Sequence, residues 1–139
     1  MEAMELDKTL KLMAQGLMCA QIPLIYALES EDEENSSLIR TLSGLNMGLT
    51  DMSGPCGALT GGCCLISYFT GKGDEVELED PAFKDMISEF TKWFKEKYGS
   101  QICIELIDGD VNNTLVRCPE MMQQSYLKAV EILQRNGVV

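Results

Sequence analysis

Histidine is absent from this chain of 139 residues. Its absence excludes catalytic triads and dyads built on imidazole, haem held by a histidine, and zinc sites that mix cysteine with histidine. A Cys-x-x-Cys-His haem attachment sequence is missing for the same reason. Because the chain nevertheless carries six cysteines, two readings stay open: a site made of cysteine alone, or cysteines that are simply buried.

Basic residues are scarce as well. The chain has eleven Lys and Arg residues against 22 Asp and Glu residues, which gives a formal net charge of −11. A charge of this sign repels phosphate backbones and anionic membrane surfaces. We therefore expect no nucleic acid and no membrane surface as a partner. Long apolar runs are also missing, since the longest stretches fall short of the ~20 residues of a membrane-spanning helix.

A secretory signal is not expected, because the N-terminus is acidic and has no basic region ahead of an apolar stretch. This favours a cytoplasmic location, where reducing conditions make cysteines metal ligands or redox thiols more often than disulfides. The length predicts a single domain over residues 1–139, which buries roughly two-thirds of its unfolded surface.

The hydrophobic pattern predicts an all-α fold of about five helices packed around a central N-terminal helix. The expected helices cover residues 6–28, 37–49, 57–69, 80–98 and 118–137. Asn35 and Ser36 are expected to cap the second of them, and Asp80 with Pro81 to start the fourth. Residues 102–107 fit either a strand or a short helix.

Two prolines lead to further predictions about where helices bend and begin. Pro23 lies inside the first expected helix, where its ring would clash with the carbonyl of Cys19 and kink the helix beside that cysteine. Pro119 follows Cys118, and the pair predicts a helix that begins with Cys118 as its cap.

Glycines spaced four residues apart leave one side of a helix bare. Gly44 with Gly48, and Gly57 with Gly61, show this spacing. Both pairs would allow another segment of backbone to approach closely.

Cys19, Cys56, Cys103 and Cys118 belong to four separate elements, and such dispersed cysteines suit a tetrahedral metal site or a metal cluster. Cys56 lies in a glycine-rich run where a loop becomes a helix, so backbone N–H groups there would stabilise its thiolate. The alternative is that free cysteines fill the core as small hydrophobic side chains. The adjacent Cys63 and Cys64 fit that alternative well.

The surroundings of these cysteines resemble the C-GCAxxG-C-C family of redox-active proteins. Met18-Cys19-Ala20-Gln21 is similar to the family's first cysteine, and Pro55-Cys56-Gly57-Ala58-Leu59-Thr60-Gly61 to its glycine-rich centre. Cys103, in the run that begins at Tyr98, and Cys118 resemble the two later cysteines. The resemblance covers about residues 15–135.

This family resembles in turn the iron–sulfur portion of split-Soret cytochromes. The resemblance implies that Cys19, Cys56, Cys103 and Cys118 hold an iron–sulfur cluster, either 2Fe-2S or 4Fe-4S, and that Cys103 lies on a short helix. The haem of those cytochromes does not carry over, because its attachment sequences are missing. The order Cys56-Gly57, where the family name has Gly-Cys, leaves the ligand set open, with Cys63 or Cys64 as a substitute ligand.

Three functions follow from these observations. The preferred one is an electron carrier that exchanges single electrons with a protein redox partner, steered by the acidic surface. The second is a thiol–disulfide redox protein with Cys56 as its reactive thiol, although no Cys-x-x-Cys pair is present. The third is a helical interaction module, either stabilised by structural zinc or metal-free. Enzymatic activity and the oligomeric state, a homodimer included, stay open.

Overall fold

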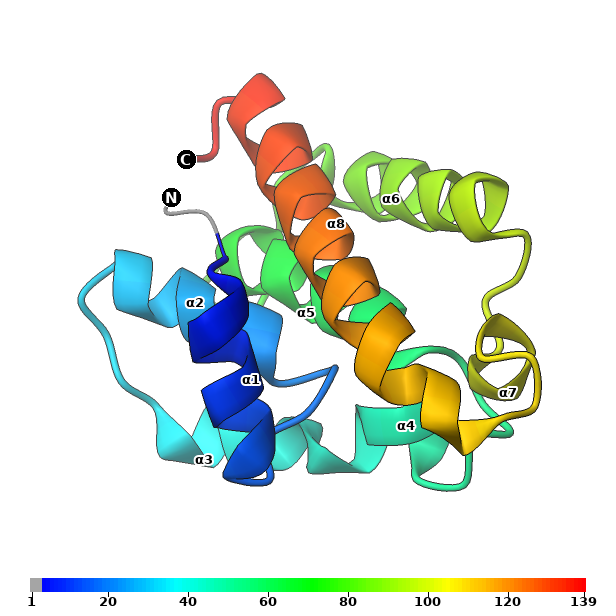
Figure 1. Ribbon diagram of the computed structural model, residues 1–139. Coiled ribbons are helices and arrows are strands. Elements are labelled where there is room, and N and C mark those ends of the chain that lie inside the picture. Colours follow the sequence, from blue (N-terminus) through cyan, green and yellow to red (C-terminus); the bar gives the residue numbers. More distant parts are fainter. Residues whose placement is uncertain (1–3) are drawn as a thin grey trace.

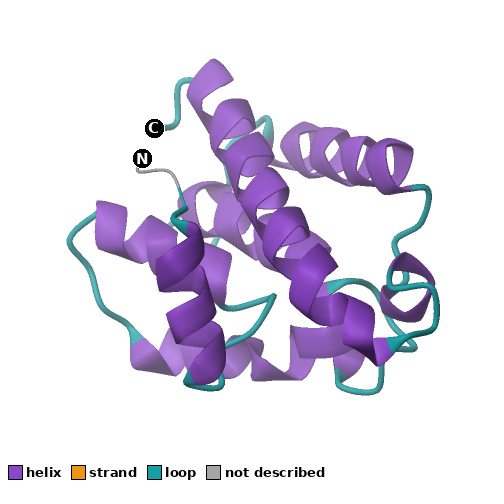
Figure 2. Ribbon diagram, in the orientation of Figure 1, coloured by secondary structure: helices purple, strands orange, loops and turns teal. Residues whose placement is uncertain are grey.

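The computed structural model describes residues 4–139 and contains helices but no strand within that range (Figure 1, Figure 2). The all-α fold expected from the hydrophobic pattern is therefore confirmed. The α-helices are α1 (Leu6–Ala14), α2 (Ile22–Ser30), α3 (Ser36–Thr41), α4 (Asn46–Leu49), α5 (Gly57–Thr70), α6 (Phe83–Tyr98), α7 (Cys103–Leu106) and α8 (Thr114–Arg135). Short 3-10 turns cover Leu42–Leu45 and Val111–Asn113.

Helix α5 packs against α2, α6 and α8, and it passes behind α8 in Figure 1. Its glycines explain how closely the segment just before α2 and the helix α6 approach. A Cβ atom added to Gly61 would lie 2.7 Å from the carbonyl oxygen of Ala20, and one added to Gly62 would lie 2.3 Å from Cζ of Phe90. The close approach expected along Gly57 and Gly61 is thus present, whereas Gly44 has nothing within 4 Å.

The single kinked helix expected over residues 6–28 is wrong. Helix α1 ends at Ala14, Gly16 takes a left-handed conformation with φ +92°, and α2 starts at Ile22 with Pro23 in its first turn. A proline is tolerated there because the first N–H groups of a helix have no intrahelical partner. Pro23 therefore starts a buried helix instead of bending a longer one, and Cys19 lies in the connecting turn.

The helix expected over residues 37–49 also stops early. Asn35 caps α3 as expected, since its side chain accepts a hydrogen bond of 3.0 Å from the Leu38 amide. Beyond Leu45, however, four consecutive residues have positive φ: Met47 at 52°, Gly48 at 59°, Leu49 at 63° and Thr50 at 76°. We call Met47–Thr50 the left-handed turn; it overlaps the segment labelled α4, whose Met47 and Gly48 do not have right-handed helical dihedral angles. Each of its non-glycine residues costs roughly 1–2 kcal/mol relative to a right-handed conformation.

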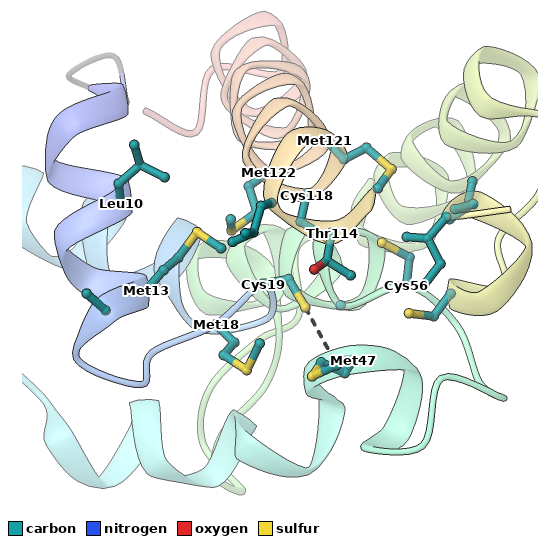
Figure 3. Close-up of a pocket in the computed structure, with 16 residues that line it drawn as sticks. Leu10, Met13, Met18, Cys19, Met47, Cys56, Thr114, Cys118, Met121 and Met122 are labelled. Carbon is teal, nitrogen blue, oxygen red and sulfur yellow. Dashed lines mark hydrogen bonds between the residues drawn. The ribbon is translucent and has the colours of Figure 1, made fainter. Parts of the chain in front are cut away.

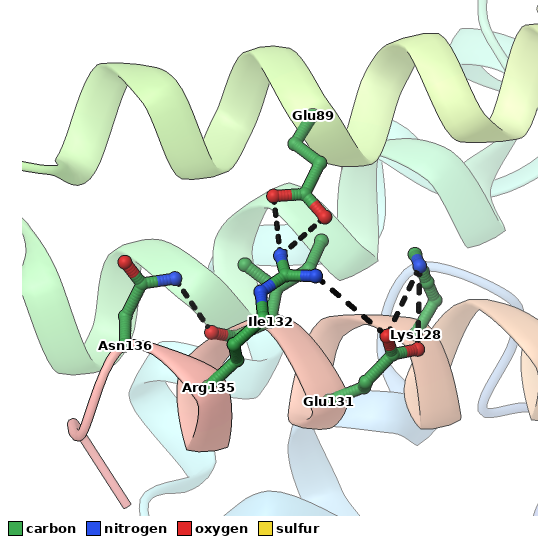
Figure 4. A network of polar contacts seen from close by, with 6 residues as sticks. All are labelled: Glu89, Lys128, Glu131, Ile132, Arg135 and Asn136. Atoms are coloured by element: carbon green, nitrogen blue, oxygen red, sulfur yellow. Dashed lines mark hydrogen bonds and ion pairs between the residues drawn. The ribbon is translucent and has the colours of Figure 1, made fainter.

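Helix α6 starts later than expected, at Phe83 and not at Asp80 and Pro81, whereas its end agrees with the sequence signals. The Asp80 side chain accepts a hydrogen bond of 2.8 Å from the Ala82 amide just before the helix, and Gly99 ends it with φ +79°. Its buried face includes Phe90 and Phe94. On the surface, Glu89 of α6 pairs with Arg135 of α8 (Figure 4). Exposed pairs of this kind contribute little to stability.

The start expected for the last helix at Cys118 is wrong, because α8 begins at Thr114 and runs through Pro119. Arg117 anchors the additional first turn: it donates a hydrogen bond of 2.9 Å to the carbonyl of Leu106 and pairs with Asp108 at 2.6 Å. Cys118 consequently lies inside the helix and does not cap it. The end expected at Gly137 fits, since that glycine has φ +72° just after Arg135.

Across the described residues, no helix combines the length and the apolar character that crossing a membrane requires.

Candidate metal centre

Four cysteines from four parts of the chain line one cavity of about 330 Å³ (Figure 3). Cys19 comes from the turn before α2, Cys56 caps the N-terminus of α5, Cys103 begins α7 and Cys118 lies in α8. These are the four residues singled out from the sequence, and the fold brings all of them to the same space.

An isolated bridge between Pro55 and Ile102 holds two of the cysteines next to each other. The amide of Cys56 donates to the carbonyl of Gln101 at 2.7 Å, and the amide of Cys103 donates to the carbonyl of Gly54 at 2.9 Å. Both cysteines directly follow a residue of the bridge. The start of α7 is thereby fixed beside the start of α5, and Cys103 lies on a short helix as the family resemblance implies.

Two glycines allow the backbone to approach the side chains of Cys19 and Cys103 closely. A Cβ atom on Gly57 would lie 2.3 Å from the Cys19 sulfur, and one on Gly48 would lie 2.5 Å from Cβ of Cys103. The Met47 amide donates a hydrogen bond of 3.4 Å to the Cys19 sulfur, drawn as a dashed line in Figure 3. Sequence reasoning missed this donor, because methionine gives no signal for a left-handed conformation.

Burial dominates the acid–base properties of the four thiols. It raises the pKa of Cys56 and of Cys118 to about 12, and it raises the pKa of Cys19 and Cys103 as well. For Cys118 the second cause is the proximity of the other three cavity cysteines, which also raises its pKa. Backbone N–H groups of Ala58 and Leu59 act in the opposite direction on Cys56. The backbone N–H groups at the glycine-rich helix start do approach the Cys56 sulfur, but burial raises its pKa by more than they lower it.

Cys63 and Cys64 do not line this cavity, although both lie on α5. Burial raises the pKa of Cys63 to about 12, and the second cause is the adjacent Cys64. The cavity cysteines are not among the causes that raise the pKa of Cys63 or of Cys64. The six cysteines therefore form two separate groups, and all six are unpaired.

The remaining wall of the cavity is rich in thioethers. Five of the nine methionines contribute to it, namely Met13, Met18, Met47, Met121 and Met122. Aliphatic side chains complete most of the wall, and Thr114 adds a hydroxyl group. These flexible, polarisable side chains surround the sulfurs with a medium of low polarity.

The spacing of the thiols bears on which centre they suit. A single zinc ion bound by four thiolates at about 2.3 Å requires sulfurs within roughly 4 Å of one another. Among residues 4–139, no three cysteine, aspartate or glutamate side chains are grouped closely enough to hold one metal ion.

The match to a protein family agrees with this arrangement. Neither a curated protein nor a solved structure matches the chain. Residues 17–132 match a family described as "Putative redox-active protein (C_GCAxxG_C_C)", and this range contains all four cavity cysteines. The match covers well over half of the sequence, so the chain belongs to the C_GCAxxG_C_C family.

Proposed function

We propose that this protein binds an iron–sulfur cluster through Cys19, Cys56, Cys103 and Cys118 and exchanges single electrons with a protein partner. The observation that carries the proposal is the meeting of four cysteines from four elements at one cavity of about 330 Å³. Cysteine thiolates are the usual ligands of such clusters, and chains without histidine can hold them.

The residues that line the cavity would each have a defined role in holding the cluster. The four thiols give up their protons on loading, since only thiolates bind metal. The amides of Met47, Ala58 and Leu59 approach the sulfurs of Cys19 and Cys56 and stabilise their negative charge. Hydrogen bonds of this kind are a principal means by which a protein sets a cluster's reduction potential. The bound cluster supplies the one-electron redox couple.

The surroundings support the role of an electron carrier. Thioether and aliphatic side chains around the sulfurs limit the access of water. The net charge of −11 favours a partner that presents a basic patch, with an association rate that falls as salt rises. Six unpaired cysteines are in keeping with a reducing compartment, and on that ground we place the protein in the cytoplasm.

The metal content of the purified protein tests this proposal. Protein prepared without oxygen is expected to be brown and to contain both iron and acid-labile sulfide. Visible absorption and chemical analysis of both elements measure this directly. Colourless protein with stoichiometric zinc would establish the zinc-stabilised module in its place. Protein that takes up neither metal, even after reconstitution with iron and sulfide, would refute both.

Alkylation of the metal-free protein separates the cluster from the thiol–disulfide alternative. Because the pKa of Cys56 is raised to about 12, this thiol is protonated at neutral pH. Its reaction with iodoacetamide at pH 7 should be at least about a hundredfold slower than that of free cysteine. The rate should rise about tenfold per pH unit up to roughly pH 11. Peptide-resolved mass spectrometry measures it, and a rate at Cys56 equal to that of free cysteine would favour a reactive thiol.

A further inference from the structure

Two buried amide side chains, Gln21 and Asn46, are bonded to each other beside Cys19. The Asn46 amide nitrogen donates to the side-chain oxygen of Gln21 at 3.0 Å. Gln21 is only 5% exposed and Asn46 only 9%. Burying two amide groups is costly unless their hydrogen bonds are made, so the pair is held in a defined geometry.

This pair is hydrogen-bonded to the backbone on both sides of Cys19. The oxygen of Gln21 accepts from the Met18 amide at 3.2 Å, and the oxygen of Asn46 accepts from the Ala20 amide at 3.0 Å. The residues immediately before and after the cysteine are therefore both bonded to the pair. The Cys19 side chain has little freedom to move away from the cavity.

The same pair also positions the hydrogen-bond donor to Cys19. Asn46 directly precedes Met47, whose amide donates to the Cys19 sulfur at 3.4 Å. From the other end, the Gln21 nitrogen donates to the carbonyl of Ile39 at 3.0 Å and to the hydroxyl of Ser43 at 3.1 Å. Segment 39–47 is thus tied to the turn that carries Cys19, and the left-handed turn is held in place against the sulfur.

Only one orientation of the Gln21 side chain satisfies its partners. If its oxygen and nitrogen were exchanged, the nitrogen would face the Met18 amide and the Asn46 amide nitrogen, which are both donors. The oxygen would then face the carbonyl of Ile39, which is an acceptor. The orientation described here pairs every donor with an acceptor.

We propose that Gln21 and Asn46 are positioning residues that hold the Met47 amide against the Cys19 sulfur and so set the reduction potential of the centre. This inference rests on the cluster proposed above. A hydrogen bond to a thiolate ligand stabilises negative charge on sulfur, and the reduced cluster carries one more electron than the oxidised one. Loosening this hydrogen bond therefore favours the oxidised cluster and lowers the potential.

The variant Asn46→Ala tests the proposal in two independent ways. In the loaded protein, the equilibrium constant for reduction against a mediator should fall about tenfold, which is ~59 mV for one electron. In the metal-free protein, the amide protons of Met18, Ala20 and Met47 should exchange with solvent at least tenfold faster, measured by NMR. Ser43→Ala removes only one outer bond of the pair, so it should retain the fold and shift the potential less, in the same direction.

Thr9→Val is the matched control. It also removes a buried hydrogen bond, between Thr9 and the Tyr26 hydroxyl at 3.2 Å, but Thr9 does not line the cavity. It should leave the potential and the exchange of those three amides unchanged. The proposal is overturned if Asn46→Ala shifts the potential no more than Thr9→Val does, or if the three amides keep their protection. Protein that never binds iron would refute the proposed function and the effect on potential, whereas the exchange measurement still decides whether the pair positions Cys19.

Discussion

Replacing Cys118 with serine is expected to abolish the iron–sulfur chromophore. Cys118 contributes to the cavity from α8, and neither Cys63 nor Cys64 lines the cavity to take its place. A serine hydroxyl is a hard oxygen ligand and replaces a thiolate poorly at a soft metal centre. Iron, acid-labile sulfide and visible absorption per chain measure the loss, and circular dichroism establishes that the helices are retained.

Cys63→Ser is the matched control for Cys118→Ser. Cys63 is also a partly buried thiol with its pKa raised to about 12, but it lies on α5 away from the cavity. This variant should keep the full iron content and colour. Retention of colour in both variants would show that the ligand assignment is wrong. Loss of colour in both would make Cys63 a ligand, contrary to its position here.

Gly61→Ala is expected to destabilise the fold by about 1–3 kcal/mol or more. The added Cβ would lie 2.7 Å from the carbonyl oxygen and 2.9 Å from Cα of Ala20. Both are backbone atoms that cannot rotate out of the way, so α5 must move away from the turn that carries Cys19. Urea unfolding of the metal-free protein measures the change in the free energy of unfolding.

Gly44→Ala provides the comparison for Gly61→Ala. A Cβ atom on Gly44 would meet nothing within 4 Å, and Gly44 does not have a positive φ. Alanine there restricts the unfolded chain, so we expect no loss and a gain of up to about 1 kcal/mol. If Gly61→Ala proved as harmless as Gly44→Ala, the tight packing of α5 against Ala20 would be refuted.

The helices whose ends carry strong local signals could be predicted from sequence. Helix α5 runs from Gly57 to Thr70 and α6 ends at Gly99, both close to the expected positions. In each case a glycine lies at the boundary, Gly57 and Gly71 at the ends of α5 and Gly99 at the end of α6. Such local effects do not depend on what the helix packs against.

The prolines show where local signals were not enough. Pro23 starts α2 and does not kink a longer helix, whereas Pro119 lies inside α8 and does not start it. A proline is tolerated in the first turn of a helix but loses a hydrogen bond inside one, so contacts elsewhere must compensate for Pro119 inside α8. For α8 the deciding contact is that of Arg117 with the carbonyl of Leu106. That contact depends on how α7 and α8 pack, which the local sequence does not reveal.

The cavity cysteines could be identified because their dispersed positions and surroundings resemble a family pattern. The residues that hold these cysteines in position could not be identified from the sequence. Gln21 and Asn46 are polar residues that sequence alone would place on the surface, yet both are buried beside Cys19. Met47, Leu49 and Thr50 have no preference for the left-handed conformation they adopt. Tertiary hydrogen bonds stabilise that conformation, and they become visible only in the folded chain.

The left-handed turn also has a geometric consequence for the sulfurs. Met47 reaches Cys19 through its amide, and the next residue, Gly48, lies against the side chain of Cys103. Two neighbouring residues therefore touch two thiols from different parts of the chain. Thiols 19 and 103 are therefore positioned against the same short turn, so a change in the backbone of that turn would displace both of them.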